Sequence, residues 1–231
     1  MTAFEIEIIF DFVCAWCYIA KRQHDLAISL YKKTYPDGKQ DSFSITWRPY
    51  YLNYNPHPHS VDKSALAETK LADLTPERRA ALTRRMEQIG RSVGIGFRWG
   101  GMIGPDTCDA HRLVRLGRGK GPEVQDALVE GLFEAYHELE RDISDKKVLR
   151  DVAVSAGIDA VEVEEFLASD TGTDEVNEEE KRIREVAGGS GVPTFVIQDA
   201  HRLAHRLEGA QNPSEIYEVF VKVNEAERGA A

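Results

Sequence analysis

The sequence predicts an α/β protein in which a β-α-β unit at the start of the chain and a β-β-α unit at its end share one sheet. Strand-like runs, alternating or wholly apolar, occur only near the two ends, whereas roughly 125 residues between them carry helical signals. Because the final hairpin needs the first unit to complete a sheet, we interpret the helical block as a large all-helical insertion into one fold. The expected boundaries place the α/β domain at 1–60 and 188–231 and the inserted helical domain at 61–187.

The first unit is predicted from three consecutive patterns. Residues 4–10 alternate at first and then become wholly apolar, as in a strand that enters a buried sheet. Residues 18–34 predict a helix with a broad apolar side, and residues 36–38 (Pro-Asp-Gly) are typical of a turn. Residues 42–48 alternate strictly and predict a second strand. A strand-helix-strand order predicts parallel strands with a right-handed crossover.

The middle of the chain is expected to start with an irregular surface loop at 49–61 and then to be helical. Thr75-Pro76 is a cap followed by an N1 proline, and Asp159 with Glu162 has capping-box spacing. The acidic stretch 174–185 is interpreted as a solvated helix face, because basic residues are mixed into it. The other expected helices lie at 75–93, at 107–117, at 122–139, from 144 to 157 and from 159 onward.

Strand signals return near the end of the chain. The run 188–191 (Gly-Gly-Ser-Gly) is a flexible approach to Val192-Pro193, and residues 194–198 predict a short buried strand. Residues 202–208 alternate and predict its hairpin partner. Asn212-Pro213, a cap with an N1 proline, then predicts the final helix.

The composition narrows the class of function. The chain has 231 residues, with 29 basic and 39 acidic side chains and a formal net charge of −10. A strongly acidic surface repels phosphate backbones, so nucleic acid and anionic membrane are poor partners. We find no apolar run near the roughly 20 residues of a membrane span and no secretory signal at the N-terminus, so the expectation is a soluble cytoplasmic protein.

Cys14 and Cys17 form a C-x-x-C pair where a strand ends and a helix begins. The first helical turn leaves backbone N–H groups unpaired, and the helix dipole adds partial positive charge, so a thiolate at Cys14 would be stabilised and its pKa lowered. The three-residue offset brings Cys17 close enough to attack a mixed disulfide formed at Cys14. This spacing predicts the nucleophilic and resolving thiols of thiol–disulfide exchange, with Trp16 as an exposed apolar rim.

Two other readings of the cysteines stay open. Half of a zinc site has the same spacing, and Cys108 with His111 could supply a third and fourth ligand. We favour a packing role for both residues and expect no metal, because a fold of this size needs none to fill its core. Alternatively, Cys14 and Cys17 are inert and the protein is a binding module.

Two motifs resemble the DsbA family of thioredoxin-fold oxidoreductases. They are the run 10–19 (FDFVCAWCYI) and the run 190–195 (SGVPTF). Within that family the chain is most similar to the FrnE-like intracellular branch, which is associated with polyketide biosynthesis. The similarity extends over nearly the whole chain through further matches at 47–49, 109–113, 142–145 and 209–211.

The resemblance implies a thioredoxin fold with an inserted helical domain and a redox-active disulfide formed by Cys14 and Cys17. It also implies that Val192-Pro193 is a cis peptide facing Cys14. A cis proline lacks an N–H and leaves neighbouring backbone groups free to pair with an extended substrate. The expected substrate-binding residues are Trp16, Val192, Pro193, Thr194 and His111.

The sequence departs from the family pattern at a few positions. The branch often has Pro where Ala15 stands, and no His lies between the cysteines, so the strongly oxidising chemistry of periplasmic relatives is not expected. The segment that starts at Asp106-Thr107-Cys108 more usually starts with Asn-Thr in the family. This departure weakens the case that the segment binds substrate.

A second enzyme class comes from sister groups of the same superfamily, the kappa-class glutathione transferases and the 2-hydroxychromene-2-carboxylate isomerases. They use bound glutathione at a site where a Ser resembles the position of Cys14. A pocket for a small molecule would then be walled by the helical insertion. Its candidate lining residues are Tyr50, Tyr51, Tyr54, His57, His59 and His111.

The expected partner is a protein or small-molecule disulfide or thiol, and glutathione is a candidate redox co-substrate without being a tightly bound cofactor. An apolar helix face in the insertion would support a homodimer. In a reducing compartment oxidase, reductase and isomerase roles differ only in potential and partner, so the direction of electron flow stays open.

Overall fold

The computed structural model describes residues 1–187, 191–198 and 204–229. These fall into two compact units, which we describe one at a time. Unit 1 comprises Met1–Tyr50 and Lys181–Ala231, and unit 2 comprises Tyr51–Glu180. The boundaries therefore lie at 50/51 and 180/181, where the sequence had suggested 60/61 and 187/188. The difference arises because the loop after residue 50 is tied to unit 2, where the buried amide of Asn55 donates to the carbonyl oxygen of Ile103 at 3.0 Å.

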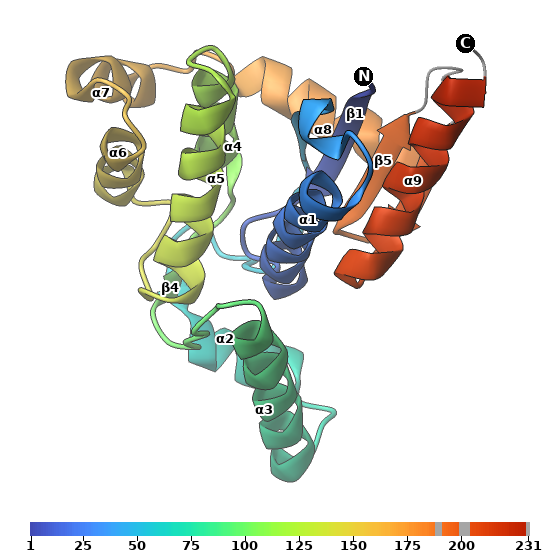
Figure 1. The fold of residues 1–231 in the computed structure, drawn as a ribbon. Coiled ribbons are helices and arrows are strands. Elements are labelled where there is room, and N and C mark those ends of the chain that lie inside the picture. The colour runs from blue at the N-terminus through green and yellow to red at the C-terminus, as the bar shows by residue number, and fades with distance from the viewer. Residues whose placement is uncertain (188–190, 199–203, 230–231) are drawn as a thin grey trace. The chain divides into compact units, whose positions relative to one another are not determined.

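Unit 1 is built on a four-stranded sheet in the order β2-β1-β5-β6, formed by β1 (Ala3–Phe10), β2 (Ser42–Pro49), β5 (Thr194–Gln198) and β6 (Ala204–Glu208). β1 pairs with β2 in parallel and with β5 antiparallel, and β5 pairs antiparallel with β6. The helix α1 (Ala15–Thr34) supplies the crossover between the two parallel strands (Figure 1). This is the predicted thioredoxin-type arrangement.

The core of unit 1 is aromatic and lies where α1 and α9 (Pro213–Gly229) pack beside each other on the sheet (Figure 1). The alternation in β1 directs Phe4 into this layer, where its ring centroid lies 5.4 Å from that of Tyr31 on α1 and 5.2 Å from that of Phe220 on α9. All three side chains are fully buried. Packing of this kind holds α1, and therefore the residues at its beginning, in one position on the sheet.

Unit 2 is mainly helical. It contains α2 (Lys63–Lys70), α3 (Pro76–Ser92), α4 (Cys108–Arg118), α5 (Pro122–His137), α6 (Lys146–Ser155), α7 (Ala160–Ala168) and the first half of α8 (Thr173–Ala187). Its core is largely aliphatic, with Leu113, Leu128, Leu132 and Leu149 fully buried, and it also contains the fully buried ring of Phe133. The helices start at the caps expected from the sequence: the side chains of Thr75 and Asp159 accept hydrogen bonds from backbone N–H groups of the first turns of α3 and α7.

The structure differs from the expected elements in two main respects. α1 starts at Ala15 rather than at residue 18, so Trp16 and Cys17 are helical. A two-stranded ladder of β3 (Val61–Asp62) and β4 (Met102–Ile103) was not predicted, because two-residue strands carry no periodicity. The approach 188–190 and residues 202–203 of the last hairpin lie outside the described residues.

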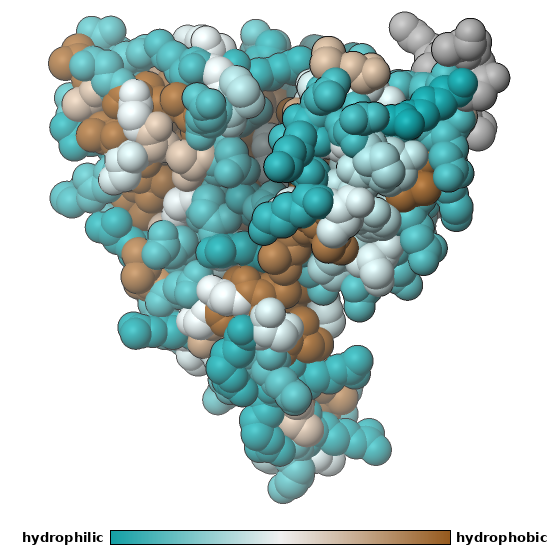
Figure 2. Space-filling model, viewed as in Figure 1, coloured by the Kyte–Doolittle hydropathy of each residue, from teal (hydrophilic) through white to brown (hydrophobic). Residues whose placement is uncertain are grey.

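The surface agrees with the acidic composition. Figure 2 shows a face covered mostly by hydrophilic residues, with scattered apolar groups between them. None of the helices in the described ranges combines the length and the apolar content that crossing a membrane requires. On α8 the acidic residues 174, 175, 178 and 185 are exposed, as expected for a solvated face, whereas Glu180 is buried and accepts a hydrogen bond from the backbone N–H of Tyr51.

Candidate active site

Cys14 occupies the N-cap position of α1, immediately after a tight turn at the end of β1. Its backbone N–H donates to the carbonyl oxygen of Asp11 at 3.2 Å, which closes that turn. Its carbonyl oxygen accepts from the N–H groups of Cys17 at 3.0 Å and Tyr18 at 3.3 Å, which starts the helix. The sulfur of Cys14 therefore stands at the end of the helix where backbone N–H groups are available to it.

The surroundings of Cys14 favour its thiolate. Its pKa is lowered, chiefly because the thiol of Cys17 donates a hydrogen bond to the Cys14 sulfur. The backbone N–H groups of Cys17 and Trp16 lower the pKa further, while burial and the negative charge of Asp11 oppose the shift. A hydrogen bond to a charged sulfur stabilises the ionised form, so Cys14 is the better nucleophile of the pair.

Cys17 has the opposite character. Burial raises its pKa well above the ordinary value, and donation of its own proton to Cys14 raises it further. Only 3% of Cys17 is exposed, against 6% of Cys14. The two thiols, which form no disulfide with each other in this structure, thus have pKa values shifted in opposite directions: Cys14 ionises more readily than an ordinary thiol, and the inner Cys17 less readily. This is the division of roles that an attacking and a resolving cysteine require.

Asp11 is a residue of the site that the sequence reasoning did not single out. Its carboxylate is buried, with 1% of the residue exposed, and its negative charge raises the pKa of both Cys14 and Cys17. Its backbone N–H has the opposite effect on Cys17, because it donates to that sulfur and lowers its pKa. A signal was present in the sequence: a single acid interrupts an otherwise apolar run between the strand and Cys14.

The loop before β5 lies against Cys14. The Sγ of Cys14 is 3.7 Å from the carbonyl oxygen of Val192, to which it donates when protonated, and the peptide bond between Val192 and Pro193 is cis. The loop is held from both sides. The hydroxyl of Thr194 donates to the carbonyl oxygen of Gly191 at 3.0 Å, and the N–H of Gly209 donates to that of Pro193 at 2.8 Å.

The sequence-predicted residues of unit 1 therefore assemble around one sulfur. Val192 is half-buried and Gly191 beside it is exposed, whereas Pro193 and Thr194 are buried. The side chain of Trp16, in the first turn of α1, is 40% exposed, which is unusual for an indole and leaves an apolar surface next to Cys14. A backbone edge and an apolar rim thus border the reactive thiol.

His111 lies in unit 2, on α4. It is buried, and its ring centroid is 5.8 Å from that of Tyr51, a neighbour that the sequence had grouped with it as a pocket-lining candidate. His57 and His59 form a second pair, with ring centroids 5.6 Å apart on an exposed bend. Tyr50 belongs to unit 1, where the guanidinium of Arg184 donates to its hydroxyl at 3.1 Å. The role of His111 in substrate binding stays a prediction.

The zinc reading finds no support in the arrangement of ligands. Within the described residues no three or more His, Cys, Asp or Glu side chains come together in a way that would hold a metal ion. Cys108 instead donates to the side-chain oxygen of Asn177 at 3.8 Å, within unit 2.

Taken together, the sheet order, the dithiol at the start of α1 and the cis proline beside Cys14 define a thioredoxin-fold protein with a paired-cysteine site. A family profile described as "DSBA-like thioredoxin domain" matches residues 5–220, which is nearly the whole chain. The chain belongs to this family.

Solved structures show the same fold. A probable DsbA oxidoreductase from Streptomyces coelicolor superposes with a TM-score of 0.79 at 24% identity, covering 95% of this chain and 89% of that one. Cytosolic disulfide reductase DsbM from Pseudomonas aeruginosa gives 0.61 at 15%, covering 98% and 100%. A 2-hydroxychromene-2-carboxylate isomerase gives 0.60 at 16%, covering 98% and 97%. Comparison with curated protein sequences gave no significant match.

Proposed function

We propose that this protein is a thiol–disulfide oxidoreductase whose redox couple is Cys14 and Cys17. The family match supports a general thiol oxidoreductase role, and one observation carries the specific assignment: the pKa values of the two sulfurs are shifted in opposite directions. That of Cys14 is lowered chiefly by the hydrogen bond from Cys17, and that of Cys17 is raised chiefly by burial and then by the same hydrogen bond. A pair of incidental cysteines has no reason to be differentiated in this way.

The reductive half-reaction follows from the two protonation states. The Cys14 thiolate attacks one sulfur of a substrate disulfide, and the other substrate sulfur leaves as a thiolate and takes up a proton from water. Cys17 then loses its proton and attacks the Sγ of Cys14. The bond between Cys14 and the substrate breaks, the second substrate thiolate leaves, and a Cys14–Cys17 disulfide forms. Two electrons pass from the protein to the substrate, and the reverse sequence oxidises a dithiol.

The substrate is proposed to lie along Gly191–Thr194, beside the exposed ring of Trp16. Val192 and Pro193 lie beside Cys14, the attacking sulfur, so an extended chain placed along this loop can bring its own sulfur to Cys14. This supports a recognition role for Trp16, Val192, Pro193 and Thr194.

The finer assignment is also part of the proposal. We propose that the protein belongs to the FrnE-like branch and serves a polyketide-type biosynthetic pathway, on the basis of the sequence resemblance. A cytoplasmic location and a homodimeric assembly are proposed from the sequence, the latter from an apolar helix face in the insertion. The similarity to a cytosolic reductase is in keeping with the location.

Glutathione is the candidate for a second function, either as redox co-substrate or as the cofactor of an isomerase or transferase. The observation that favours it is a structural relative, DsbM, which was solved with glutathione and superposes with a TM-score of 0.59 at 15% identity, covering 96% of this chain and 99% of that one. The intact resolving thiol at Cys17 favours the redox use of glutathione over the isomerase use.

The test is reduction of insulin disulfides by dithiothreitol, catalysed by the wild type and by three single variants. Cys14→Ser is expected to fall to the uncatalysed rate, because the nucleophile is gone. Cys17→Ser is expected to accumulate a mixed disulfide between Cys14 and insulin, visible by mass spectrometry. Cys108→Ser is the matched control and should keep the wild-type rate. Full activity of Cys14→Ser would refute the proposal.

The same variants distinguish an isomerase-type use of glutathione from its use as a redox co-substrate. Stoichiometric binding of glutathione to Cys14→Ser, together with unchanged turnover of an isomerase-type small molecule, would promote the isomerase reading. Loss of glutathione-coupled disulfide reduction in that variant supports the redox reading.

A further inference from the structure

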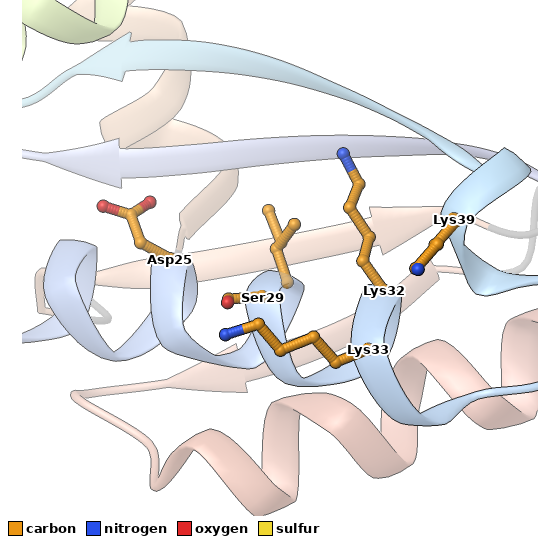
Figure 3. Close-up of a pocket in the computed structure, with 6 residues that line it drawn as sticks. Asp25, Ser29, Lys32, Lys33 and Lys39 are labelled. Atoms are coloured by element: carbon orange, nitrogen blue, oxygen red, sulfur yellow. The ribbon is translucent and has the colours of Figure 1, made fainter.

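A hollow of about 420 Å³ lies along the second half of α1 (Figure 3). It is lined by Asp25, Ile28, Ser29, Lys32, Lys33 and Lys39. Five of these residues come from α1, and Lys39 comes from the short 3-10 helix η1 (Gly38–Gln40) that follows it. Cys14 caps the opposite end of this 20-residue helix, about 27 Å from Lys32 along the axis.

Three positive charges at this hollow have no carboxylate partner in the described part of the chain. Lys32, Lys33 and Lys39 are exposed and form no ion pair there; Lys32 stands over the ring of Phe43, with its Nζ 5.2 Å from the ring centroid. The chain has ten more acidic than basic residues, so a cluster of unneutralised lysines is a local exception to its charge. The Asp25 carboxylate is bonded to the Nζ of Lys21 at 2.9 Å.

The helix end explains only part of this arrangement. Lys32 and Lys33 lie in the last turn of α1, where cations complement the exposed carbonyl groups. Lys39 is not on α1. It belongs to η1, which packs closely against α1 through Gly38. A Cβ on Gly38 would lie 2.8 Å from the carbonyl oxygen of Tyr31, so only glycine lets η1 approach α1 this closely. Asp37, in the left-handed conformation with φ 61°, makes the turn.

The chemistry of the walls defines the ligand. Ile28 and the aliphatic stems of the lysines provide apolar lining. The hydroxyl of Ser29 and the ammonium groups of the lysines, which Figure 3 labels, are donors. Asp25 stands at the other end of the row and retains acceptor capacity for an amino group. The volume lies in the range typical of small-molecule sites, of about 300–1,000 Å³. Clustered lysines act as point charges suited to phosphate groups.

We infer that this hollow binds a small molecule of the nucleoside diphosphate class, with its phosphates held by Lys32, Lys33 and Lys39 and its base over Ile28 toward Asp25. The site uses neither cysteine and is separate from the proposed redox reaction. It would let the protein sense or carry a phosphorylated metabolite at the end of α1 remote from Cys14.

The experiment is calorimetric titration of the full-length protein with ADP, and in parallel with inorganic pyrophosphate, at low and at physiological salt. Wild type is expected to bind one ADP per chain with a dissociation constant below about 1 mM, more weakly as salt rises. Pyrophosphate should bind at least about tenfold more weakly, because it lacks the apolar group that the floor accommodates. Equal binding of the two probes would overturn the nucleoside assignment.

The double variant Lys32→Ser/Lys39→Ser is expected to weaken ADP binding by at least about tenfold. The charge-matched control is Lys70→Ser/Lys222→Ser, which changes two exposed lysines of α2 and α9 and should bind as wild type does. Far-UV circular dichroism checks that each variant is folded, and insulin reduction checks that Cys14 is intact. No saturable binding by wild type, or equal loss in the double variant and the control, would refute the site independently of the redox proposal.

Discussion

Cys14 and Cys108 are two thiols in similar backbone positions with opposite chemistry. Cys14 caps α1 and Cys108 is the first residue of α4, so both stand at the positive end of a helix dipole. The pKa of Cys14 is nevertheless lowered and that of Cys108 is raised. A helix N-terminus alone therefore does not make a reactive cysteine in this protein.

The difference lies in the nearest donors and acids. Cys14 receives a hydrogen bond from the thiol of Cys17, and this contribution outweighs its burial. For Cys108 the desolvation caused by burial dominates; the hydroxyl of Tyr51 opposes it, and the charges of Asp106 and Asp109 add to it. Burial of the Cys108 sulfur, reinforced by the two nearby carboxylates, thus outweighs the stabilisation of its thiolate by Tyr51.

The first prediction tests this difference with Cys17→Ala, which removes the thiol that donates a hydrogen bond to Cys14. The pKa of Cys14 should then rise, because the largest stabilising contribution to its thiolate is lost. A hydrogen bond to a charged group is worth about 1.5–3 kcal/mol, so alkylation of Cys14 by iodoacetamide at pH 7 should slow by roughly tenfold or more.

The control for this change is Cys17→Ser, which replaces the thiol by a hydroxyl donor of similar size. It should keep much of the reactivity of Cys14 toward iodoacetamide. An equal rate in Cys17→Ala and wild type would mean that the helix end, and not the neighbouring thiol, stabilises the thiolate.

The second prediction concerns the pH dependence of the wild type. A lowered pKa means that Cys14 ionises at lower pH than an ordinary thiol, and the raised values of Cys108 and Cys17 mean that these ionise at higher pH. As pH rises, alkylation should mark Cys14 first, Cys108 next and Cys17 last. Peptide mass spectrometry across pH 5 to about 10 gives the midpoint for Cys14 and shows whether Cys108 and Cys17 start to react only toward the alkaline end of this range. A midpoint for Cys108 below that of Cys14 would contradict the assignment.

The smallest expected effect comes from Asp11→Asn. The buried charge of Asp11 raises the pKa of both Cys14 and Cys17, so its neutralisation should lower both. Alkylation of Cys14 at pH 6 should rise, by less than about tenfold. Because the reduced dithiol is then the better-stabilised form, the reduction potential measured against glutathione should become less negative. A more negative potential would show that Asp11 acts through another group.

Much of unit 1 could be predicted from its sequence, because its signals are local. The alternation in residues 42–48 and the turn residues 36–38 specify a β-α-β unit, and the C-x-x-C pair falls at its first strand-to-helix junction. The lowered pKa of Cys14 was also predicted, but only from the unpaired backbone N–H groups and the dipole at the start of the helix. Its main cause is a contact between two side chains that no periodicity describes.

The rest depended on contacts between residues far apart in sequence. The position of the Val192 carbonyl beside Cys14 joins residues 178 positions apart. Asn55 shows the same effect in unit 2: it was expected in an irregular surface loop, yet only 4% of it is exposed, because its amide bonds to Ile103. Helices with clear caps were predictable to within a few residues, whereas the two-residue ladder of β3 and β4 was not.

The protonated state of Cys17 has a consequence for the timing of catalysis. In the proposed mechanism, once Cys14 is joined to a substrate, release waits until Cys17 loses its proton. Burial raises the pKa of Cys17 and so makes that loss infrequent near neutral pH. The covalent complex therefore has a built-in dwell time, during which a bound polypeptide can rearrange or a slow second reactant can arrive. The lifetime of this covalent complex should therefore become shorter as the pH rises.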